Sequence, residues 1–436
     1  MTRVYDLVGI GFGPSNLALA VALAERGDSP LDAVFLEKQK AFGWHRDMLL
    51  DGATMQVSFL KDLVTMRNPV SRHSFVNYLH AKGRLADFIN LKTMYPTRLE
   101  FHDYLSWVAA DFDDRVRYGA EVVTVRPVED ADGRVELLDV VVQRGGPDGE
   151  LATYRARNLV VAAGLRPTLP DGMVTDGRVW HSQELLTRLD GLTSPPRRFV
   201  VVGAGQSGAE VTEHLHRRFP GAEICAVFAR YGYSPADDSP FANRIFDPAA
   251  VDDFYASPEP VKRMLLDYHA NTNYAVVDLD LLRELYRRVY EERAAGTERL
   301  RVMNMSRVTG LSDEGTHVEV TVRSLADGEV ERLRADAVVY ATGYRPVDPL
   351  DLLGAAGAYC LRDEHGGLRV GRDHRLETTG GMDCGIYLQG ATEHTHGLTS
   401  TLLSTTAVRA GEILGSILGP AGRPHVPSAS SPRATG

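Results

Sequence analysis

Residues 4–16 read VYDLVGIGFGPSN, a short apolar run followed by a turn with three glycines and a proline. The apolar run is rich in valine and isoleucine, which is typical of a strand buried on both faces of a parallel sheet. The following residues, 17–26, are suited to a helix. This order predicts a binding site for the phosphates of a dinucleotide, because such a turn and the helix N-terminus direct backbone N–H groups at the anion.

A second unit of the same kind begins at residue 198. Residues 198–208 read RFVVVGAGQSG, and a helix-forming run follows at 209–218. Two further apolar runs end in glycine turns, LVVAAGLRP at 159–167 and AVVYATGYRP at 337–346. The chain therefore predicts an α/β fold with two Rossmann-like dinucleotide-binding domains, the second inserted into the first, and a small, mostly helical substrate-binding region.

The residues that close the second strand of each unit carry opposite charges. Glu37 follows the first turn, and a carboxylate there can accept hydrogen bonds from a ribose diol. Arg230 holds the corresponding position after the second turn, where a cation suits the 2′-phosphate of NADPH. We therefore expect FAD at the first turn and NADPH at the second.

Composition excludes several classes of protein. The 436 residues suffice for two or three domains, and 48 Lys and Arg against 58 Asp and Glu give a net charge of −10 without a basic run, which argues against nucleic-acid binding. The three cysteines, Cys225, Cys360 and Cys384, have neither redox-pair nor metal-ligand spacing. We expect no metal site, no disulfide reductase and a reducing cytoplasm. The glycines and Pro14 interrupt the apolar run 7–24, so we expect no membrane span.

The positions of the two glycine turns predict the domain boundaries. We expect the FAD-binding domain in two parts, 1–190 and 331–418, with the second part completing the substrate site. Between them we expect an NADPH-binding domain at 191–330, with a substrate-binding insertion at about 235–300. Residues 419–436 are rich in proline, serine and glycine, which predicts a disordered tail.

Longer motifs identify a family. They are FGWH at 42–45, QVSFLKDLVTMRNP at 56–69, DDSPFAN at 237–243, NTNYAVVD at 271–278 and HGLTSTLLS at 396–404. With these motifs the chain resembles the microbial flavin-dependent N-hydroxylating monooxygenases, most of all the L-ornithine N5-monooxygenases of siderophore biosynthesis. The resemblance implies that NADPH reduces FAD and that O₂ then gives a C4a-hydroperoxyflavin, which hydroxylates the side-chain amine of L-ornithine. The product, N5-hydroxyornithine, would serve hydroxamate siderophores or related natural products.

The glycine turns and the resemblance together imply three sets of site residues. Expected FAD contacts are Gly9, Gly11, Gly13, Pro14, Ser15, Asn16, Glu37, Trp44, His45, Gln56 and Leu403. Expected NADPH contacts are Gly203, Gly205, Gln206, Ser207, Gly208, Arg230, Asn273, Ala341, Thr342, Gly343 and Tyr344. Expected substrate contacts are Gln56, Lys61, Asn243, Thr272, Asn273 and Ser404. The resemblance implies that Lys61 grips the substrate carboxylate, and that the flavin carries the chemistry with support from Gln56, Asn273 and Ser404.

The protonation of the substrate adds one further expectation. A side-chain amine with a pKa near ~10.4 is mostly protonated in neutral water, so the enzyme must bind or create the neutral form. A neighbouring carboxylate would raise that pKa. We therefore expect neutral groups, such as Ser404 and the Asn273 carbonyl, around the amine.

Several alternatives remain open at this point. L-Lysine differs from L-ornithine by one methylene, worth only about 1–3 kcal/mol in a pocket, and a diamine would make no use of Lys61. Taken alone, Lys61 could be a surface lysine paired with Asp62. A flavin monooxygenase for lipophilic amines, sulfides or ketones and an NADPH-responsive binding protein are further alternatives. A homo-oligomer, either a dimer or a tetramer, is a further expectation.

Overall fold

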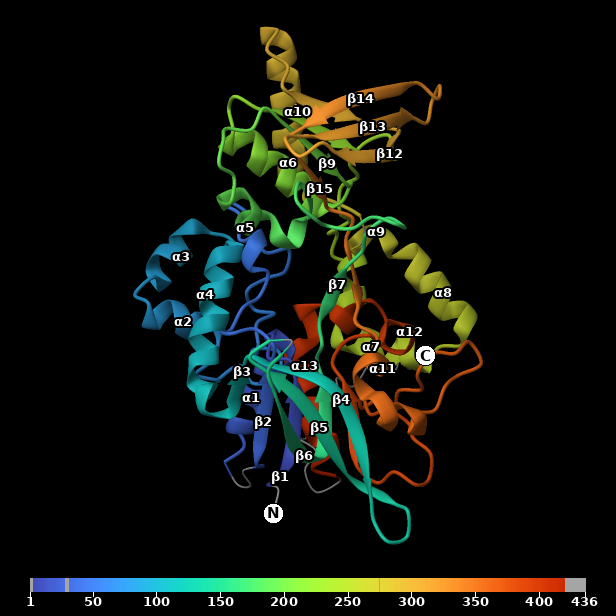
Figure 1. Cartoon of the computed structure of the whole chain (residues 1–436). Helices are drawn as coiled ribbons and strands as arrows, with labels where there is room; N and C mark the ends of the chain where they lie inside the picture. The colour runs from blue at the N-terminus through green and yellow to red at the C-terminus, as the bar shows by residue number, and fades with distance from the viewer. Residues whose placement is uncertain (1–2, 28–30, 147, 274, 420–436) are drawn as a thin grey trace.

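The computed structural model describes residues 3–27, 31–146, 148–273 and 275–419, and it contains two α/β bodies. The lower body in Figure 1 holds the N-terminal strand, and the upper body holds the second glycine turn. The chain passes between them through β7 (Leu165–Pro167) and returns through β16 (Tyr344–Pro346). These two crossing strands pair antiparallel, so the chain runs out and back through two adjacent segments.

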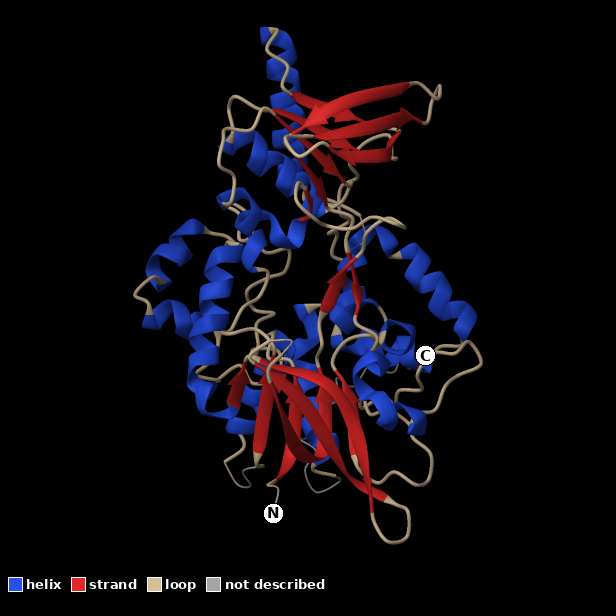
Figure 2. Cartoon of the chain, viewed as in Figure 1, coloured by secondary structure: helices blue, strands red, loops and turns tan. Residues whose placement is uncertain are grey.

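The lower sheet combines parallel and antiparallel parts (Figure 2). Its strands, in spatial order, are β3 (Val116–Tyr118), β2 (Ala33–Glu37), β1 (Val4–Ile10), β6 (Glu150–Val161), β5 (Val135–Arg144) and β4 (Ala120–Glu129), with β17 (Gly385–Leu388) also paired to β6. The strands β3, β2, β1, β6 and β17 run parallel, whereas β5 and β4 extend the sheet antiparallel from the start of β6. The parallel strands are almost continuously apolar and buried, as the sequence predicts.

The lower body also contains helices. They are α1 (Pro14–Ala24), α2 (Phe75–Ala81), α3 (Leu85–Leu91), α4 (Arg98–Ala109), α11 (Pro349–Leu353), α12 (Glu393–His396) and α13 (Thr406–Ile417). Helix α1 packs against α13, and α2 and α4 share a buried aromatic cluster in which Phe75 stacks on Phe101 with ring centroids 5.8 Å apart. Short 3₁₀ turns are η1 (Arg46–Met48), η2 (Ala110–Arg115), η5 (Gly354–Tyr359), η6 (Leu398–Thr401) and η7 (Leu403–Thr405).

The upper sheet is a parallel sheet of Rossmann type. Its strands, in spatial order, are β11 (Leu300–Met303), β10 (Glu223–Val227), β9 (Arg198–Val202), β15 (Ala337–Tyr340) and β8 (Val179–His181). One face packs against α5 (Leu185–Asp190), α6 (Gln206–Arg218) and α10 (Leu279–Ala295), with η3 (Ser182–Glu184) leading into α5. The other face packs against the antiparallel sheet of β12 (Ser306–Asp313), β13 (Val318–Ser324) and β14 (Val330–Ala335).

The strand pairing shifts the domain boundaries from those we expected. Strand β8 begins at Val179, before residue 190, and β15 ends at Tyr340, after residue 330, yet both pair within the upper sheet. Because these strands have only three and four residues, sequence alone did not assign them to the second domain. The crossing strands β7 and β16 therefore mark the boundaries more closely than residues 190 and 330.

Part of the expected insertion leaves the upper body. It consists of η4 (Ala242–Phe246), α7 (Pro248–Ala256), α8 (Glu259–Tyr268) and α9 (Ala270–Asn273). Helix α7 contacts α12 of the lower body, and Asp252 on α7 pairs with Arg372 at 2.6 Å. The insertion therefore spans the gap between the two bodies on the right of Figure 1.

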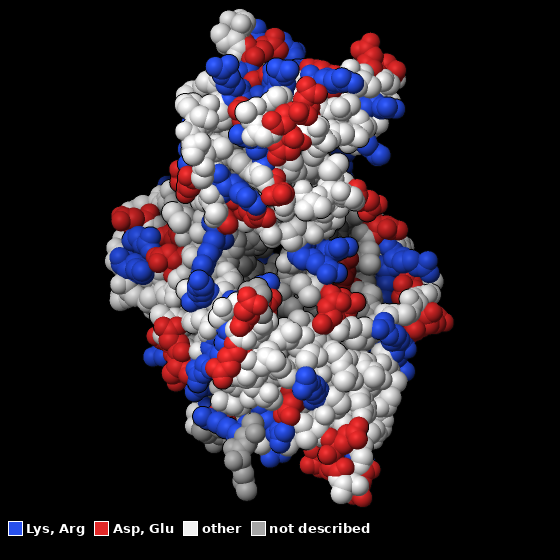
Figure 3. All heavy atoms as spheres, in the orientation of Figure 1, with Lys and Arg blue, Asp and Glu red and all other residues white. Residues whose placement is uncertain are grey.

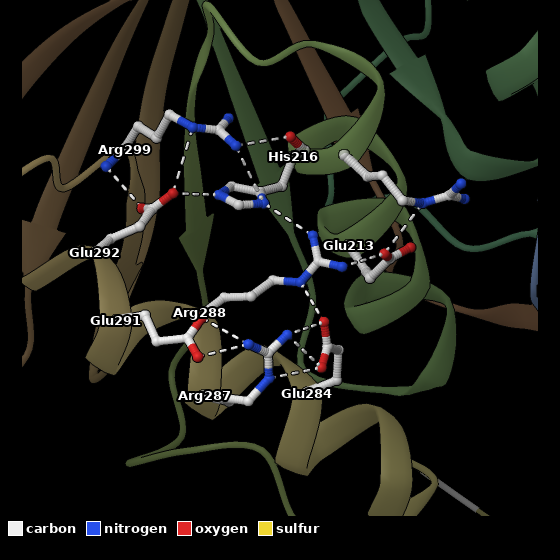
Figure 4. Close-up of polar contacts among 9 residues, drawn as sticks. Glu213, His216, Glu284, Arg287, Arg288, Glu291, Glu292 and Arg299 are labelled. Carbon is white, nitrogen blue, oxygen red and sulfur yellow. Dashed lines mark hydrogen bonds and ion pairs between the residues drawn. The ribbon is translucent and has the colours of Figure 1, made fainter. Parts of the chain in front are cut away.

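Helix α10 does not belong to this insertion, although the expected range of 235–300 included it. Figure 4 shows α10 fastened to α6 and to the start of β11 by a cluster of charged residues. The Glu292 carboxylate accepts hydrogen bonds from His216 Nε2 at 2.6 Å and from the backbone N–H groups of Arg299 and Leu300, both at 2.9 Å. These contacts make α10 the helix that connects β10 to β11 in the upper body.

Two expectations concern the chain ends and membranes. The disordered tail was expected at residues 419–436. Of these, residues 420–436 lie outside the described part of the chain, and Gly419 is described. In the described ranges, no helix combines the length and the apolar character needed to cross a bilayer.

We predict that His214 makes the upper body sensitive to acid. His214 lies on α6 with 5 % exposure, and burial together with Arg218 and Arg217 lowers its pKa to about 4. Since the unfolded chain binds this proton more readily, His214 costs stability as pH falls from about 6.5 to about 4, up to about 3 kcal/mol. Urea unfolding at a series of pH values should show a shallower acid slope for His214→Leu than for the wild type. Equal slopes in the two proteins would contradict the prediction.

Candidate functional site

One cavity of about 2450 Å³ lies between the two bodies and is lined by both glycine turns. Figure 3 shows the hollow between the upper and lower halves, with both signs of charge scattered around it. Strands β1, β2, β9 and β15 all end at the cavity wall, and ligands of open α/β sheets bind at the carboxyl ends of the strands. A pocket for one small molecule typically measures about 300–1,000 Å³, so this cavity can hold more than one ligand.

Most of the expected site residues line this cavity. From the FAD set these are Gly11, Gly13, Pro14, Ser15, Glu37, Trp44, His45, Gln56 and Leu403. From the NADPH set they are Gly203, Gly205, Gln206, Ser207, Arg230, Ala341, Thr342, Gly343 and Tyr344. From the substrate set they are Gln56, Lys61, Asn243, Thr272 and Ser404. Asn273 ends α9, but its side chain lies outside what the structure describes.

The first glycine turn is shaped by close backbone packing. Gly11 has φ +81°, and a Cβ there would lie 2.4 Å from the Ala162 carbonyl oxygen. At Gly13, by contrast, a Cβ would meet no protein atom within 4 Å, so this glycine keeps the cavity side of the turn open. The turn therefore lets a pyrophosphate approach the N-terminus of α1 closely.

Gly9 and Asn16 support this turn from behind rather than from the cavity. A Cβ at Gly9 would lie 2.3 Å from Phe35 Cδ1. Asn16 is fully buried, and its amide donates to the carbonyl oxygens of Ile10 at 3.2 Å and Gly11 at 2.7 Å. Neither residue lines the cavity, and both support the backbone of the turn; their expected contact with FAD stays a prediction.

Glu37 is held at the end of β2 by two backbone amides. Its Oε2 accepts from Phe12 N–H at 2.7 Å and its Oε1 from Gln39 N–H at 2.8 Å. A carboxylate has about four lone-pair positions, so acceptors remain for the hydroxyls of a ribose. The turn and this carboxylate fit FAD.

The second turn is packed even more tightly. Gly203 has φ +145°, and a Cβ there would lie 2.3 Å from the Ala341 carbonyl oxygen. Gly208 does not line the cavity; a Cβ on it would lie 2.5 Å from the Gly203 carbonyl oxygen, so it brings α6 close to β9. Gly208 therefore acts on packing, and its expected contact with NADPH stays a prediction.

Arg230 is the cation of the second site. Its Nη1 donates to the Ala275 carbonyl oxygen at 2.8 Å, which ties the side chain to the segment after α9. Within the described part of the chain Arg230 forms no ion pair, so its charge remains available for a phosphate. These residues fit NADPH.

Trp44 and His45 follow β2 and bring aromatic rings to the cavity. The His45 ring lies 4.7 Å from the Trp44 ring and 6.2 Å from that of Tyr344 on β16, both edge to face. Although part of the His45 ring opens on the cavity, its depth between the bodies and the nearby Arg98 lower its pKa to about 4. His45 is therefore a neutral imidazole at neutral pH, beside the crossing strand.

Lys61 lines the cavity and forms no ion pair with any residue that the structure describes. The alternative of a surface pair with Asp62 is wrong, because the buried Asp62 carboxylate accepts from the backbone N–H groups of Val64, Thr65 and Phe75 at 2.6–2.9 Å. The Lys61 ammonium lies 5.9 Å from the Phe246 ring, and burial lowers its pKa while Asp247 opposes this change. A half-buried ammonium of this kind calls for an anionic ligand.

Three other expected substrate contacts surround the same cavity from different elements. Asn243 lies on η4, where its amide donates to the Asp238 carbonyl oxygen at 2.8 Å. Thr272 lies on α9, and Ser404 lies on η7 with 3 % exposure. All three residues line the cavity that Lys61 lines, and Phe246, at the end of η4, lies beside the Lys61 ammonium.

Sequence reasoning gave no role to several polar residues of the cavity wall, among them Arg98, Glu210 and Asp278. Glu210 lies one helical turn after Gln206, so its spacing was a signal that could have been used. Arg98 and Asp278 lie 112 residues before and 68 residues after Glu210. Nothing local in the sequence announces that they meet.

The geometry of the first turn predicts opposite behaviour for two alanine variants. Gly11→Ala should destabilise the FAD-free protein by about 2 kcal/mol, because a left-handed backbone and a carbonyl contact oppose the methyl group. Gly13→Ala should leave that stability unchanged but weaken FAD binding by at least about tenfold. Urea unfolding of the FAD-free variants and titration of FAD fluorescence measure the two effects. Equal stability losses, or unchanged FAD affinity of Gly13→Ala, would contradict this account.

Comparison with known proteins agrees with the geometry. Residues 3–346 match the family model described as L-lysine 6-monooxygenase/L-ornithine 5-monooxygenase. An L-ornithine N(5)-monooxygenase of Burkholderia cepacia is 46 % identical over 402 residues, 90 % of each chain.

Two solved structures are similar over 95 % of this chain and 99 % of theirs. The ornithine N-hydroxylase of Kutzneria sp. 744, with reduced FAD, NADP⁺ and L-ornithine, has a TM-score of 0.91 and 47 % identity. An L-lysine 6-monooxygenase from Pseudomonas syringae has a TM-score of 0.82 and 33 % identity. The expected family is thereby confirmed: the chain belongs to the L-lysine 6-monooxygenase/L-ornithine 5-monooxygenase family of flavin-dependent N-hydroxylating enzymes.

Proposed function

We propose that this chain hydroxylates the side-chain amine of L-ornithine with NADPH, O₂ and FAD, giving N5-hydroxyornithine. The observation that carries the proposal is the shared cavity: both dinucleotide turns open on it, and it is lined by the Lys61 ammonium, which forms no ion pair among the described residues. FAD bound at the first turn supplies the redox chemistry, accepting a hydride from NADPH and activating dioxygen.

The relatives favour ornithine over the alternatives. The relative named for ornithine and solved with it is 47 % identical, whereas the one named for lysine is 33 % identical. None of the relatives reported above is named as a flavin monooxygenase for lipophilic substrates or as an NADPH-responsive binding protein. The hydroxylated amine would enter a hydroxamate siderophore or a related natural product.

The residues of the cavity would bind and orient the substrate. Lys61 pairs with the α-carboxylate of the substrate, which gives the half-buried ammonium an anionic partner. Ser404, a neutral hydroxyl in a buried wall, suits an uncharged amine, because a carboxylate in its place would favour the protonated form. The ring of Phe246 beside Lys61 narrows this part of the cavity and reduces its contact with water.

The remaining expectations are compatible with this function. Cys225, Cys360 and Cys384 are free thiols, which fits work in a reducing cytoplasm. The homo-oligomer stays a prediction, to be tested by light scattering of the purified protein.

Substrate choice is tested by assaying hydroxylamine formation with L-ornithine, L-lysine and putrescine side by side. The proposal expects product with ornithine, much less with lysine and least with putrescine, which lacks the carboxylate for Lys61. Rapid NADPH oxidation without hydroxylated product from any of the three would contradict it.

The role of Lys61 is tested by Lys61→Met, which keeps the length of the side chain and removes its charge. KM for ornithine should rise at least about 30-fold, about 2 kcal/mol, because a charged hydrogen bond is lost. KM for putrescine should stay the same. Lys40→Met, at an exposed lysine beyond β2, is the matched control. An unchanged KM for ornithine in Lys61→Met would remove Lys61 from the substrate site.

A further inference from the structure

Five polar side chains form a continuous bridge across the cavity wall, from the lower body to the upper body and back. Arg98 begins α4 of the lower body and makes a two-pronged ion pair with Glu210 on α6, at 2.7 and 2.9 Å. Gln56, from the lower body, donates to Asp278 at the start of α10 at 3.2 Å. Within the bridge, these two polar contacts join the lower body to the upper body.

Gln206, in the second glycine turn, joins these two contacts. Its Nε2 donates to Glu210 and to Asp278, both at 2.9 Å, which uses both amide hydrogens. Its Oε1 accepts from the backbone N–H of Asp278 at 2.9 Å. All polar atoms of the Gln206 side chain are thus committed to the bridge, and the residue cannot rotate without breaking it.

The ion pair between Arg98 and Glu210 is the most buried part of the bridge. The side chains of Arg98 and Glu210 are 13 % and 5 % exposed. Arg98 is further anchored because its Nη1 donates to the Met48 carbonyl oxygen at 3.1 Å. Breaking a buried pair leaves an uncompensated charge, so this contact resists separation of the bodies.

Other side-chain contacts between the bodies lie closer to solvent. Thr187 Oγ1 donates to Asp47 at 2.7 Å, and Arg217 donates to the Asp51 carbonyl oxygen at 2.9 Å, both at exposed positions. Such contacts contribute little to a fixed geometry. The buried bridge is therefore the contact best placed to set the angle between the bodies.

We propose that Gln206, Glu210 and Asp278 are positioning residues that, with Arg98 and Gln56, hold the upper body at the angle that hydride transfer requires. This inference rests on the proposed function, in which a hydride passes between ligands held by different bodies. A misplacement of about 1 Å costs up to about 100-fold in rate, so a bridge that fixes the angle acts directly on the rate of flavin reduction.

The test uses Gln206→Met, which keeps the length of the side chain and removes its hydrogen bonds. Spin labels at Ile89→Cys on α3 and Tyr290→Cys on α10, both exposed, report the distance between the bodies in a Cys360→Ser background. The ligand-free Gln206→Met protein should show a broader distance distribution than the wild type. A residue that merely touched the nucleotide would leave this distribution unchanged, and that result would overturn the proposal.

Kinetics of the FAD-bound protein complete the test. Reduction of the flavin by saturating NADPH should slow about 10- to 100-fold in Gln206→Met, while reduction by dithionite should not change. Asp278→Asn replaces a carboxylate oxygen that accepts from Gln206 or Gln56 with an amide group, and it should also slow flavin reduction by NADPH. This variant replaces Gln206→Met in the test if Gln206→Met does not fold.

Arg217→Met, which removes an exposed contact between the bodies, is the matched control and should reduce its flavin at the wild-type rate. Wild-type rates in both bridge variants would overturn the proposal. Failure of the proposed function would differ from this outcome, because the wild type itself would then form no hydroxylated ornithine.

Discussion

The structure depends on the place where the chain crosses between its two bodies. Both crossings occur directly beyond the carboxyl ends of parallel strands, β6 on the way out and β15 on the way back. The two segments are tied together by Thr168 N–H to the Gly343 carbonyl oxygen at 2.9 Å and Val347 N–H to the Gly164 carbonyl oxygen at 3.2 Å. This double crossing turns the ligand-binding edges of both sheets toward one cavity, so two nucleotides and a small molecule can meet there.

Further contacts close the cavity around this crossing. On one side, the polar bridge through Gln206 fixes the upper body against α4. On the other, Arg372 joins Asp252 of the insertion to Glu412 of α13, at 2.6 and 2.9 Å. The pKa of Glu412 is lowered to about 2 because hydrogen bonds and charge from His374 and Arg372 outweigh its burial, so this link stays ionised over the neutral range. Asn243 precedes α7 and Ser404 precedes α13 in the chain, and both line the cavity.

The sequence predicted best those residues whose role depends on the local geometry of the backbone. The glycine turns follow directly from spacing, since Gly11 and Gly203 need backbone angles and close approaches that a side chain would prevent. Glu37 and Arg230 also lie where their distance from the turns placed them, at the cavity wall. In both cases the signal lies within one strand–turn–helix–strand unit.

Features that depend on distant partners were predicted poorly. The short strands β8 and β15 join the upper sheet through pairing with residues far along the chain, which a local pattern does not encode. The sequence did not indicate that the side-chain amide of Asn16, expected to contact FAD, also holds the carbonyl groups of Ile10 and Gly11 in the turn. The Arg98–Glu210 pair joins helices of different bodies, and only the folded chain reveals it.

The central claim is that one cavity brings oxygen activation and the substrate amine together. The most direct measurement is turnover under oxygen-18 gas, with mass spectrometry of the amine product and a parallel assay of hydrogen peroxide. The account predicts that hydroxylated ornithine carries one oxygen-18 atom for nearly every NADPH oxidised, and that peroxide stays low when ornithine is present. Recovery of ornithine without any oxygen-18, together with recovery of all the consumed oxygen as hydrogen peroxide, would contradict it.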